Sequence, residues 1–348
     1  MRFKFIKIVL IALVANFSLN VEASPWPIYD DFMQKHYHEG KIVNTDGNIY
    51  ASEQIYAMFF ALVQKDQKRF DKLYSYLKQN FVKGSFEKNL VPIAFDGQKV
   101  VKDGIYTDYN LFLAYTLINA NAIFDGEQYL NDALLILKNI KSNFAFNNQH
   151  FGNILLPYWQ NLKEHSFTLN SNTYAPFVLA KIASIDPEFK ELYLNSMQAL
   201  IKASGLGFVP DELKFNHQGD FLVYKNTYAK DKALNFYLWL SISPKADPNY
   251  RLLKLVFENL TDDANAYEKL DDLVNFYDKS INQSNKMLTK ISLLNLCEHK
   301  IKDHLRAFIK AYHFSSEQSL EHLAAMFALG IDELRFDFSE NGSVLIGK

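Results

Sequence analysis

The chain has 348 residues, with 37 Lys or Arg and 39 Asp or Glu, so its formal net charge is −2. This mildly acidic balance argues against a nucleic-acid surface and against a surface for anionic lipid, and it suits a neutral ligand. The single cysteine, Cys297, excludes an intramolecular disulfide. Stability must therefore come from a large hydrophobic core, which a chain of this length can bury.

The N-terminal segment, residues 1–23, has the features of a secretory signal peptide. Three basic residues precede an apolar run over residues 8–17, and the small residues that a signal peptidase reads predict cleavage before Ser24. The run is short for a membrane span, although a retained signal anchor is the alternative. We expect a periplasmic or secreted protein, without membrane attachment after cleavage, whose residues 24–348 form a single domain.

Helical periodicity runs through most of the remaining sequence, in which glycine and proline are sparse. Four pairs of helices are predicted: 52–64 with 67–81, 108–124 with 127–142, 173–183 with 187–204, and 231–242 with 248–260. Weaker helical patterns follow at 282–296, 299–312 and 316–329. Residues 334–338 alternate in polarity, which predicts a short terminal strand.

The lengths of the links between helices predict how the pairs are arranged. The two helices of a pair are joined by a few residues and must run antiparallel, whereas roughly 25 residues separate one pair from the next. All the long loops then lie on one face, together with the N-terminus of the first helix of each pair. Repeated helical hairpins of this kind predict an all-α toroid with a cleft on its loop face. An α-solenoid would have shorter and more uniform loops.

Three carboxylates lie where a long loop enters the first helix of a pair: Glu53, Asp108 and Asp231. If they converge on one cleft, they fit glycoside hydrolysis, in which an acid protonates the leaving oxygen and a second carboxylate activates water or attacks the sugar. For each residue taken singly, capping is the stronger explanation, because acidic side chains stabilise helix N-termini. The same effect favours the ionised form, so Glu53 can be the acid only where burial or a neighbouring carboxylate outweighs it.

Residues 52–62 read SEQIYAMFFAL and are similar to the pattern S-E-G-Q-S-Y-x-M-x-F-A-L of glycoside hydrolase family 8. Further segments match motifs of this family in order, at residues 26–27, 40–43, 66–80, 107–115, 155–157, 169–170, 174–176, 207–211, 236–239 and 335–339. The chain thus resembles the family 8 endo-β-1,4-glucanases, above all the periplasmic enzymes of bacterial cellulose-synthase operons. The resemblance implies an (α/α)6 barrel and inverting hydrolysis of cellulose-type glucan. No cofactor is implied, and the scattered histidines suggest no metal site.

The resemblance also implies roles for particular residues. Glu53 would be the general acid and Asp231 the base. Five further residues would contact the sugar: Asp108 and Asn110 at the scissile bond, and the rings of Tyr106, Tyr109 and Trp159 as stacking platforms.

This sequence departs from the family pattern at the chemical positions. Counting without gaps places Ser52 at the acid and Lys232 at the base, so that Asp231 is one residue early, which is about 100° of rotation on a helix. Asn110 replaces an aspartate and Glu212 replaces a tryptophan. Either the active site has been re-registered, or the protein binds glycan without cleaving it.

The expected partner is a β-1,4-linked polysaccharide or oligosaccharide, bound by a monomer that works beside a cellulose-synthase system. A hydrolase of xylan or chitosan is a further alternative, because a fold does not fix its substrate.

Overall fold

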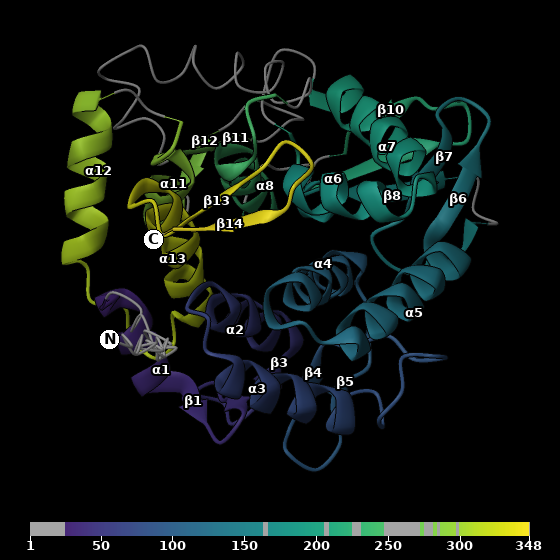
Figure 1. Ribbon diagram of the computed structural model, residues 1–348. Coiled ribbons are helices and arrows are strands. Elements are labelled where there is room, and N and C mark those ends of the chain that lie inside the picture. The colour runs from purple at the N-terminus through teal and green to yellow at the C-terminus, as the bar shows by residue number, and fades with distance from the viewer. Residues whose placement is uncertain are drawn as a thin grey trace, which may run out of the picture.

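A closed ring of helices encloses the core of this chain (Figure 1). The computed structural model describes residues 25–162, 166–204, 209–224, 231–246, 272–274, 281–283, 286–296 and 299–347. Within these ranges the helices of the inner wall are α2 (Ala51–Val63), α4 (Thr107–Phe124), α6 (Pro176–Ile185), α8 (Asp231–Ile242), α11 (Lys286–Leu293) and α13 (Ser319–Asp332). Each inner helix contacts the next, and α13 contacts α2, so the ring is closed.

The outer helices pack against this wall from outside (Figure 1). They are α3 (Gln67–Asn80), α5 (Glu127–Phe144), α7 (Glu188–Ser204), α12 (His299–Ala311) and α1 (Pro27–His36). The burial of side chains explains the two layers. The inner helix α4 is buried on nearly all sides, whereas the outer helix α3 buries one stripe, formed by Phe70, Leu73, Tyr74 and Leu77. A helix that is apolar on all sides must be surrounded by other elements, as α4 is. A helix with one apolar stripe, such as α3, packs that stripe against the inner wall and leaves its other side in solvent.

The predicted hairpins are confirmed with small shifts at their ends for the first three pairs and for α8. The second helix of the fourth pair, expected at 248–260, lies outside the described residues. Of the weaker patterns, α12 and α13 are confirmed, and α11 is confirmed with a later start because residues 281–283 form strand β12. The prediction missed α1, although its buried residues Tyr29, Phe32, Met33 and His36 have helical spacing.

The long loops are not irregular throughout, because short antiparallel strands shape them. The strands are β1 (Tyr37–His38), β2 (Lys41–Ile42), β3 (Ile49–Tyr50), β4 (Ala94–Phe95), β5 (Val100–Lys102), β6 (Ala145–Asn148), β7 (Gly152–Leu155), β8 (Ser166–Asn170), β9 (Glu212–Asn216), β10 (Phe221–Leu222), β11 (Asp272–Val274) and β12 (Ile281–Gln283). The pair β8–β9 joins the loop before α6 to the loop before α8. A 3₁₀ turn, η2 (Ser171–Thr173), follows β8.

The expected terminal strand is confirmed as β13 (Phe336–Phe338), and it pairs with β14 (Val344–Ile346). This hairpin crosses the ring where the inner helices end (Figure 1). Phe338 stacks on Phe177 with ring centroids 4.1 Å apart, and the Val344 amide donates to Asn119 Oδ1 at 3.1 Å. Its turn approaches α6 so closely that a Cβ on Gly342, whose φ is +75°, would lie 1.9 Å from the Phe177 carbonyl oxygen.

Candidate active site

A cavity of about 400 Å³ lies where the inner helices begin, and we call it the loop-face cavity. Its walls come from α2, α4, α8 and α13 and from the loops that enter them. The lining residues are Ser52, Tyr56, Ile93, Lys102, Tyr106, Asp108, Tyr109, Asn170, Asn172, Lys232, Asn235, Leu238, Trp239, Leu320, Ala324 and Phe327. The first turns of α2, α4 and α8, which we expected to converge on one cleft, therefore meet at this cavity.

Asp108, in the first turn of α4, lies in the wall of this cavity. Its Oδ1 accepts from the backbone amide of Tyr109 at 2.8 Å, and its Oδ2 accepts from Asn172 Nδ2 at 2.9 Å. Burial raises the pKa of Asp108, and these two donors together with the charge of Lys232 oppose the rise. Among the three predicted acids, Asp108 is the one that lines the cavity.

Asn110, two residues after Asp108 in α4, is fully buried. Its amide Nδ2 donates to the carbonyl oxygens of Val91 at 3.1 Å and Tyr106 at 2.8 Å, and its Oδ1 accepts from the Val91 amide at 2.9 Å. Both amide hydrogens are thus used to hold the preceding loop against α4. Asn110 therefore shapes the loop beside the site, but it does not line the cavity.

The three predicted aromatic residues have different positions. Tyr106 and Tyr109 line the cavity, and the Tyr109 hydroxyl is fixed by donating to Gly104 O and accepting from the Tyr106 amide, both at 3.2 Å. Trp159 is 75% exposed and does not line it. It follows Tyr158, whose ring packs on Tyr106 at 5.6 Å, so Trp159 is an exposed ring next to the cavity wall.

Glu53 is 2% exposed and is not among the lining residues. Its Oε1 accepts from Ser319 Oγ at 2.6 Å and from Asn44 Nδ2 at 3.0 Å, and its Oε2 has no partner. Burial raises the pKa of Glu53 to about 7, against the lowering effect of the Ser319 hydroxyl. Glu53 is therefore an acid that holds its proton near neutral pH, as a proton donor must, but Ser52 is the residue that faces the cavity.

Gln54, the residue after Glu53 in α2, fixes the rotation of this helix about its own axis. The Gln54 side chain accepts from the Ile42 amide at 2.8 Å and donates to the carbonyl oxygens of Gly40 at 2.7 Å and Leu73 at 2.9 Å. Such a fully paired buried amide is costly to move, since each lost partner leaves a buried polar atom unsatisfied. These bonds point Ser52 inward and Glu53 toward α13.

The start of α8 has the same arrangement. Asp231 is exposed and does not line the cavity, whereas Lys232 does. The helix start is capped by Asp211, whose Oδ1 accepts from the Ala233 amide at 2.9 Å. Lys232 Nζ is bound to Glu212 Oε1 at 2.8 Å. Lys232 and Glu212, which we expected to replace an aspartate and a tryptophan of the family pattern, thus form an ion pair with each other.

The sequence did not lead us to expect Asn172 at the site. Tyr56 was expected only as an apolar neighbour of Glu53, and Asn235 and Trp239 only as positions of a family motif. All four line the cavity. A signal for Asn172 was present, because it lies between two matched motifs, at 169–170 and 174–176, in the loop before α6.

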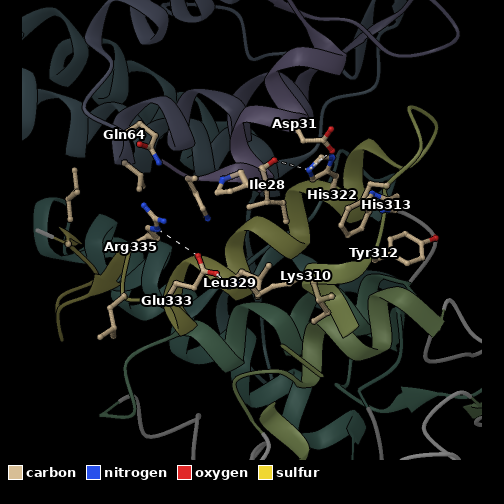
Figure 2. Close-up of a pocket in the computed structure, with 18 of the residues that line it drawn as sticks. Ile28, Asp31, Gln64, Lys310, Tyr312, His313, His322, Leu329, Glu333 and Arg335 are labelled. Atoms are coloured by element: carbon tan, nitrogen blue, oxygen red, sulfur yellow. Dashed lines mark hydrogen bonds and ion pairs between the residues drawn. The ribbon is translucent and has the colours of Figure 1, made fainter. Parts of the chain in front are cut away.

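A second cavity, of about 1030 Å³, lies away from the loop face, between α1, α12 and the C-terminal ends of α2 and α13 (Figure 2). His322 is at one side, where its Nε2 lies 2.9 Å from Ile28 O, and burial lowers its pKa to about 4. Arg335 and Glu333 are at the other side. None of the predicted site residues lines this cavity.

Comparison with known proteins agrees with this architecture. A model of the glycosyl hydrolases family 8 matches residues 1–287, and the chain belongs to this family. An endoglucanase of Salmonella typhi is 23% identical over 343 residues, which cover 94% of this chain and 93% of the relative.

Solved structures show the same fold. An endo-1,4-D-glucanase from Vibrio fischeri ES114 matches with a TM-score of 0.83 at 20% identity, over 92% of this chain and 99% of that one. An endo-β-1,4-glucanase from Acetobacter xylinum matches with a TM-score of 0.73 at 18% identity, over 88% and 98%. The predicted (α/α)6 barrel and the predicted family are confirmed.

Two further observations apply to the described part of the chain. It contains no helix long and apolar enough to cross a membrane. It also contains no group of three or more His, Cys, Asp or Glu side chains that could hold a metal ion.

Proposed function

We propose that this chain is an endo-β-1,4-glucanase that hydrolyses cellulose-type glucan. The observation that carries the proposal is the loop-face cavity of a family 8 barrel, which combines a carboxylate, Asp108, with the rings of Tyr106 and Tyr109. Flat apolar rings pack on sugar faces, and a carboxylate accepts hydrogen bonds from sugar hydroxyls. The relative from Salmonella typhi, which is named an endoglucanase, aligns with this chain over nearly its full length.

In the proposed inverting reaction, Glu53 donates its proton to the glycosidic oxygen as the bond from that oxygen to C1 breaks. Asp231 accepts a proton from the water whose oxygen forms the new bond to C1. The two carboxyl groups of an inverting enzyme are separated by about 6.5–9.5 Å. In its buried orientation toward α13, Glu53 has a pKa of about 7, so it carries a proton before it turns toward the sugar. For both residues to face the sugar, the first turns of α2 and α8 must each rotate by about 100° when substrate binds.

One observation favours a second candidate, a glycan-binding protein without hydrolytic activity. Ser52 and Lys232 line the cavity in place of Glu53 and Asp231, and Gln54 and the Lys232–Glu212 pair hold them there. A serine and a paired ammonium supply neither the acid nor the base that inversion needs. This candidate keeps the sugar contacts of Asp108 and the aromatic rings.

Release of reducing sugar from carboxymethylcellulose tests the proposal, with cellohexaose binding measured in parallel. The wild-type protein should release sugar, and Glu53→Gln should lower the rate by at least a hundredfold, which is the low end for a lost general acid. Wild-type activity that survives Glu53→Gln would exclude Glu53 as the donor. Binding of cellohexaose without turnover would support the second candidate.

A double substitution, Ser52→Glu with Lys232→Asp, separates the candidates further. It places carboxyl groups at the two positions that face the cavity. A gain of hydrolysis would show that these positions, and not Glu53 and Asp231, face the scissile bond. If Glu53 and Asp231 carry the reaction, the double variant should lose activity. Xylan and chitosan as alternative substrates test the identity of the glycan.

We also propose that residues 1–23 direct export, that the mature chain works as a monomer in the periplasm or outside the cell, and that it accompanies a cellulose-synthase system. The basic, apolar and small-residue regions of this segment support export. N-terminal sequencing of the protein from a periplasmic fraction should begin at Ser24. Light scattering during gel filtration should give the mass of one chain.

A further inference from the structure

A chain of hydrogen bonds in the wall of the loop-face cavity links an indole to a carboxylate. Trp239 Nε1 donates to Asn172 Oδ1 at 2.8 Å, and Asn172 Nδ2 donates to Asp108 Oδ2 at 2.9 Å. The three residues belong to α8, η2 and α4, which lie far apart in the sequence, and all three line the cavity.

The chemistry of these groups fixes the direction of both bonds. An indole N–H only donates, so the atom of Asn172 that faces Trp239 must be the amide oxygen. The amide NH₂ of Asn172 must then face Asp108, which accepts. Trp239 itself is 4% exposed and is wedged between Phe327 at 5.0 Å and Tyr56 at 5.8 Å. The buried indole therefore has a fixed position, and its N–H group prevents the Asn172 amide from flipping.

We propose that Asn172 and Trp239 are positioning residues, which hold Asp108 as a fixed acceptor for a sugar hydroxyl in the cavity. The inference rests on the proposed function, because it takes the cavity to be the glycan site. Each oxygen of Asp108 has one donor from the protein, Tyr109 or Asn172. Since a carboxylate oxygen accepts two hydrogen bonds, each oxygen keeps one acceptor position for the ligand. A preorganised acceptor binds with a smaller loss of conformational entropy than a mobile one.

Trp239→Phe is the sharpest test, because it removes the N–H donor and keeps an aromatic ring. Without that donor the Asn172 amide can turn its oxygen toward Asp108, where two acceptors repel each other. The dissociation constant for cellohexaose, measured by calorimetry, should rise about tenfold, which corresponds to about 1.4 kcal/mol. Tyr237→Phe is the matched control. It removes a buried ring hydroxyl from the same helix, one that accepts from the Val209 amide at 2.9 Å outside the cavity, and it should leave the affinity unchanged.

Asn172→Asp adds a readout that packing alone would not change. The variant has a carboxyl group at residue 172 beside that of Asp108, because Asn172 Nδ2 now lies 2.9 Å from Asp108 Oδ2. Such a pair keeps one shared proton to a higher pH than an isolated carboxyl does. Cellohexaose affinity of this variant should therefore fall as the pH rises through the titration of the pair, whereas the wild-type affinity should not change over that range.

A second measurement keeps the inference testable if the protein binds no cellohexaose, a result that would contradict the proposed function. Carboxyl ¹³C NMR of Asp-labelled protein follows the titration of Asp108 directly. Losing a donor to the ionised form raises a carboxyl pKa, so Trp239→Phe and Asn172→Leu should both raise the pKa of Asp108. If the affinity and the titration of Asp108 are the same in Trp239→Phe as in wild type, the positioning role is wrong.

Discussion

Glu53 shows how two opposing effects determine the protonation of one side chain. It lies in the first turn of α2, where the helix dipole favours a carboxylate by about 0.3–1 kcal/mol. Removal from water opposes ionisation more strongly, and burial raises the pKa of Glu53 to about 7. One oxygen receives two hydrogen bonds and the other has none. The neutral acid is therefore the form that fits this site up to neutral pH.

This protonation predicts a pH-dependent stability. Between pH 4.5 and about 7 the unfolded chain ionises Glu53 while the folded chain keeps the proton, so the free energy of unfolding falls as the pH rises. Glu53→Gln removes this slope, because a glutamine imitates the protonated acid. The variant should gain on the order of 3 kcal/mol relative to wild type between pH 4.5 and pH 8.

Urea denaturation at several pH values measures this gain. Glu340→Gln, at an exposed glutamate, is the control and should show no change in its pH dependence relative to wild type. Parallel stability curves for wild type and Glu53→Gln would rule out an elevated pKa at this position.

The orientation of single residues at helix starts was the part of the site that the sequence could not provide. Adjacent residues of a helix point about 100° apart, and an acidic residue is favourable in a first turn whether it faces a cavity or a neighbour. Gln54 and Asp211 decide the rotation of α2 and α8, through partners that lie in other segments: Gly40 and Leu73 for Gln54, and Ala233 for Asp211. Periodicity does not reveal such long-range bonds.

At the level of elements, a buried carboxylate of α13 binds two cations of α12. The Asp332 side chain is 1% exposed. It accepts from Nε and Nη2 of Arg306, and from Lys302 Nζ at 3.1 Å. Both cations come from α12 and are partly exposed. A buried carboxylate of this kind is stable only while its partners remain.

Asp332→Asn should therefore lower the free energy of unfolding by about 1.5–3 kcal/mol, the usual contribution of hydrogen bonds to a charged group. Amide hydrogen exchange should show the largest increase along α12. Glu188→Gln, which removes one partner of an exposed pair with Lys141, is the matched control and should cost less than about 1 kcal/mol. A loss at Asp332 no larger than that of the control would contradict this account.

Most helices could be predicted from the sequence because each buries apolar residues at a regular spacing. The short strands of the loops could not be predicted. β3, for example, has two residues, and its pairing with β4 is set by a segment more than forty positions away. Such strands have too few residues to show a period of two.

For the whole molecule, the contacts of α13 with α2 close the ring, and the C-terminal hairpin fills its end. Phe338 is 5% exposed and packs on Phe177, Tyr115 and Phe59. On the same hairpin, Leu345 is 52% exposed. The hairpin thus has one face in the barrel core and one face in solvent.

Phe338→Ala should destabilise the whole barrel by about 3–5 kcal/mol, since it leaves a cavity among large rings. Leu345→Ala should cost less than about 1 kcal/mol, because an exposed apolar side chain contributes little. Calorimetric unfolding of both variants measures the difference. Similar losses in the two variants would mean that the hairpin does not pack into the core as described.

The hairpin also has a consequence for the order of folding. Its bonds join the last residues of the chain to distant segments: Val344 to Asn119, and Arg335 to the carbonyl oxygen of Pro25. None of these contacts can form until Arg335 and Val344 have been synthesised, and contacts between such distant residues form slowly. The barrel therefore cannot complete these contacts before the C-terminal hairpin has been made. If residues 1–23 direct export, this delay would favour passage of the unfolded chain through a translocation pore. The hairpin contacts would then form only after the C-terminal residues have crossed the membrane.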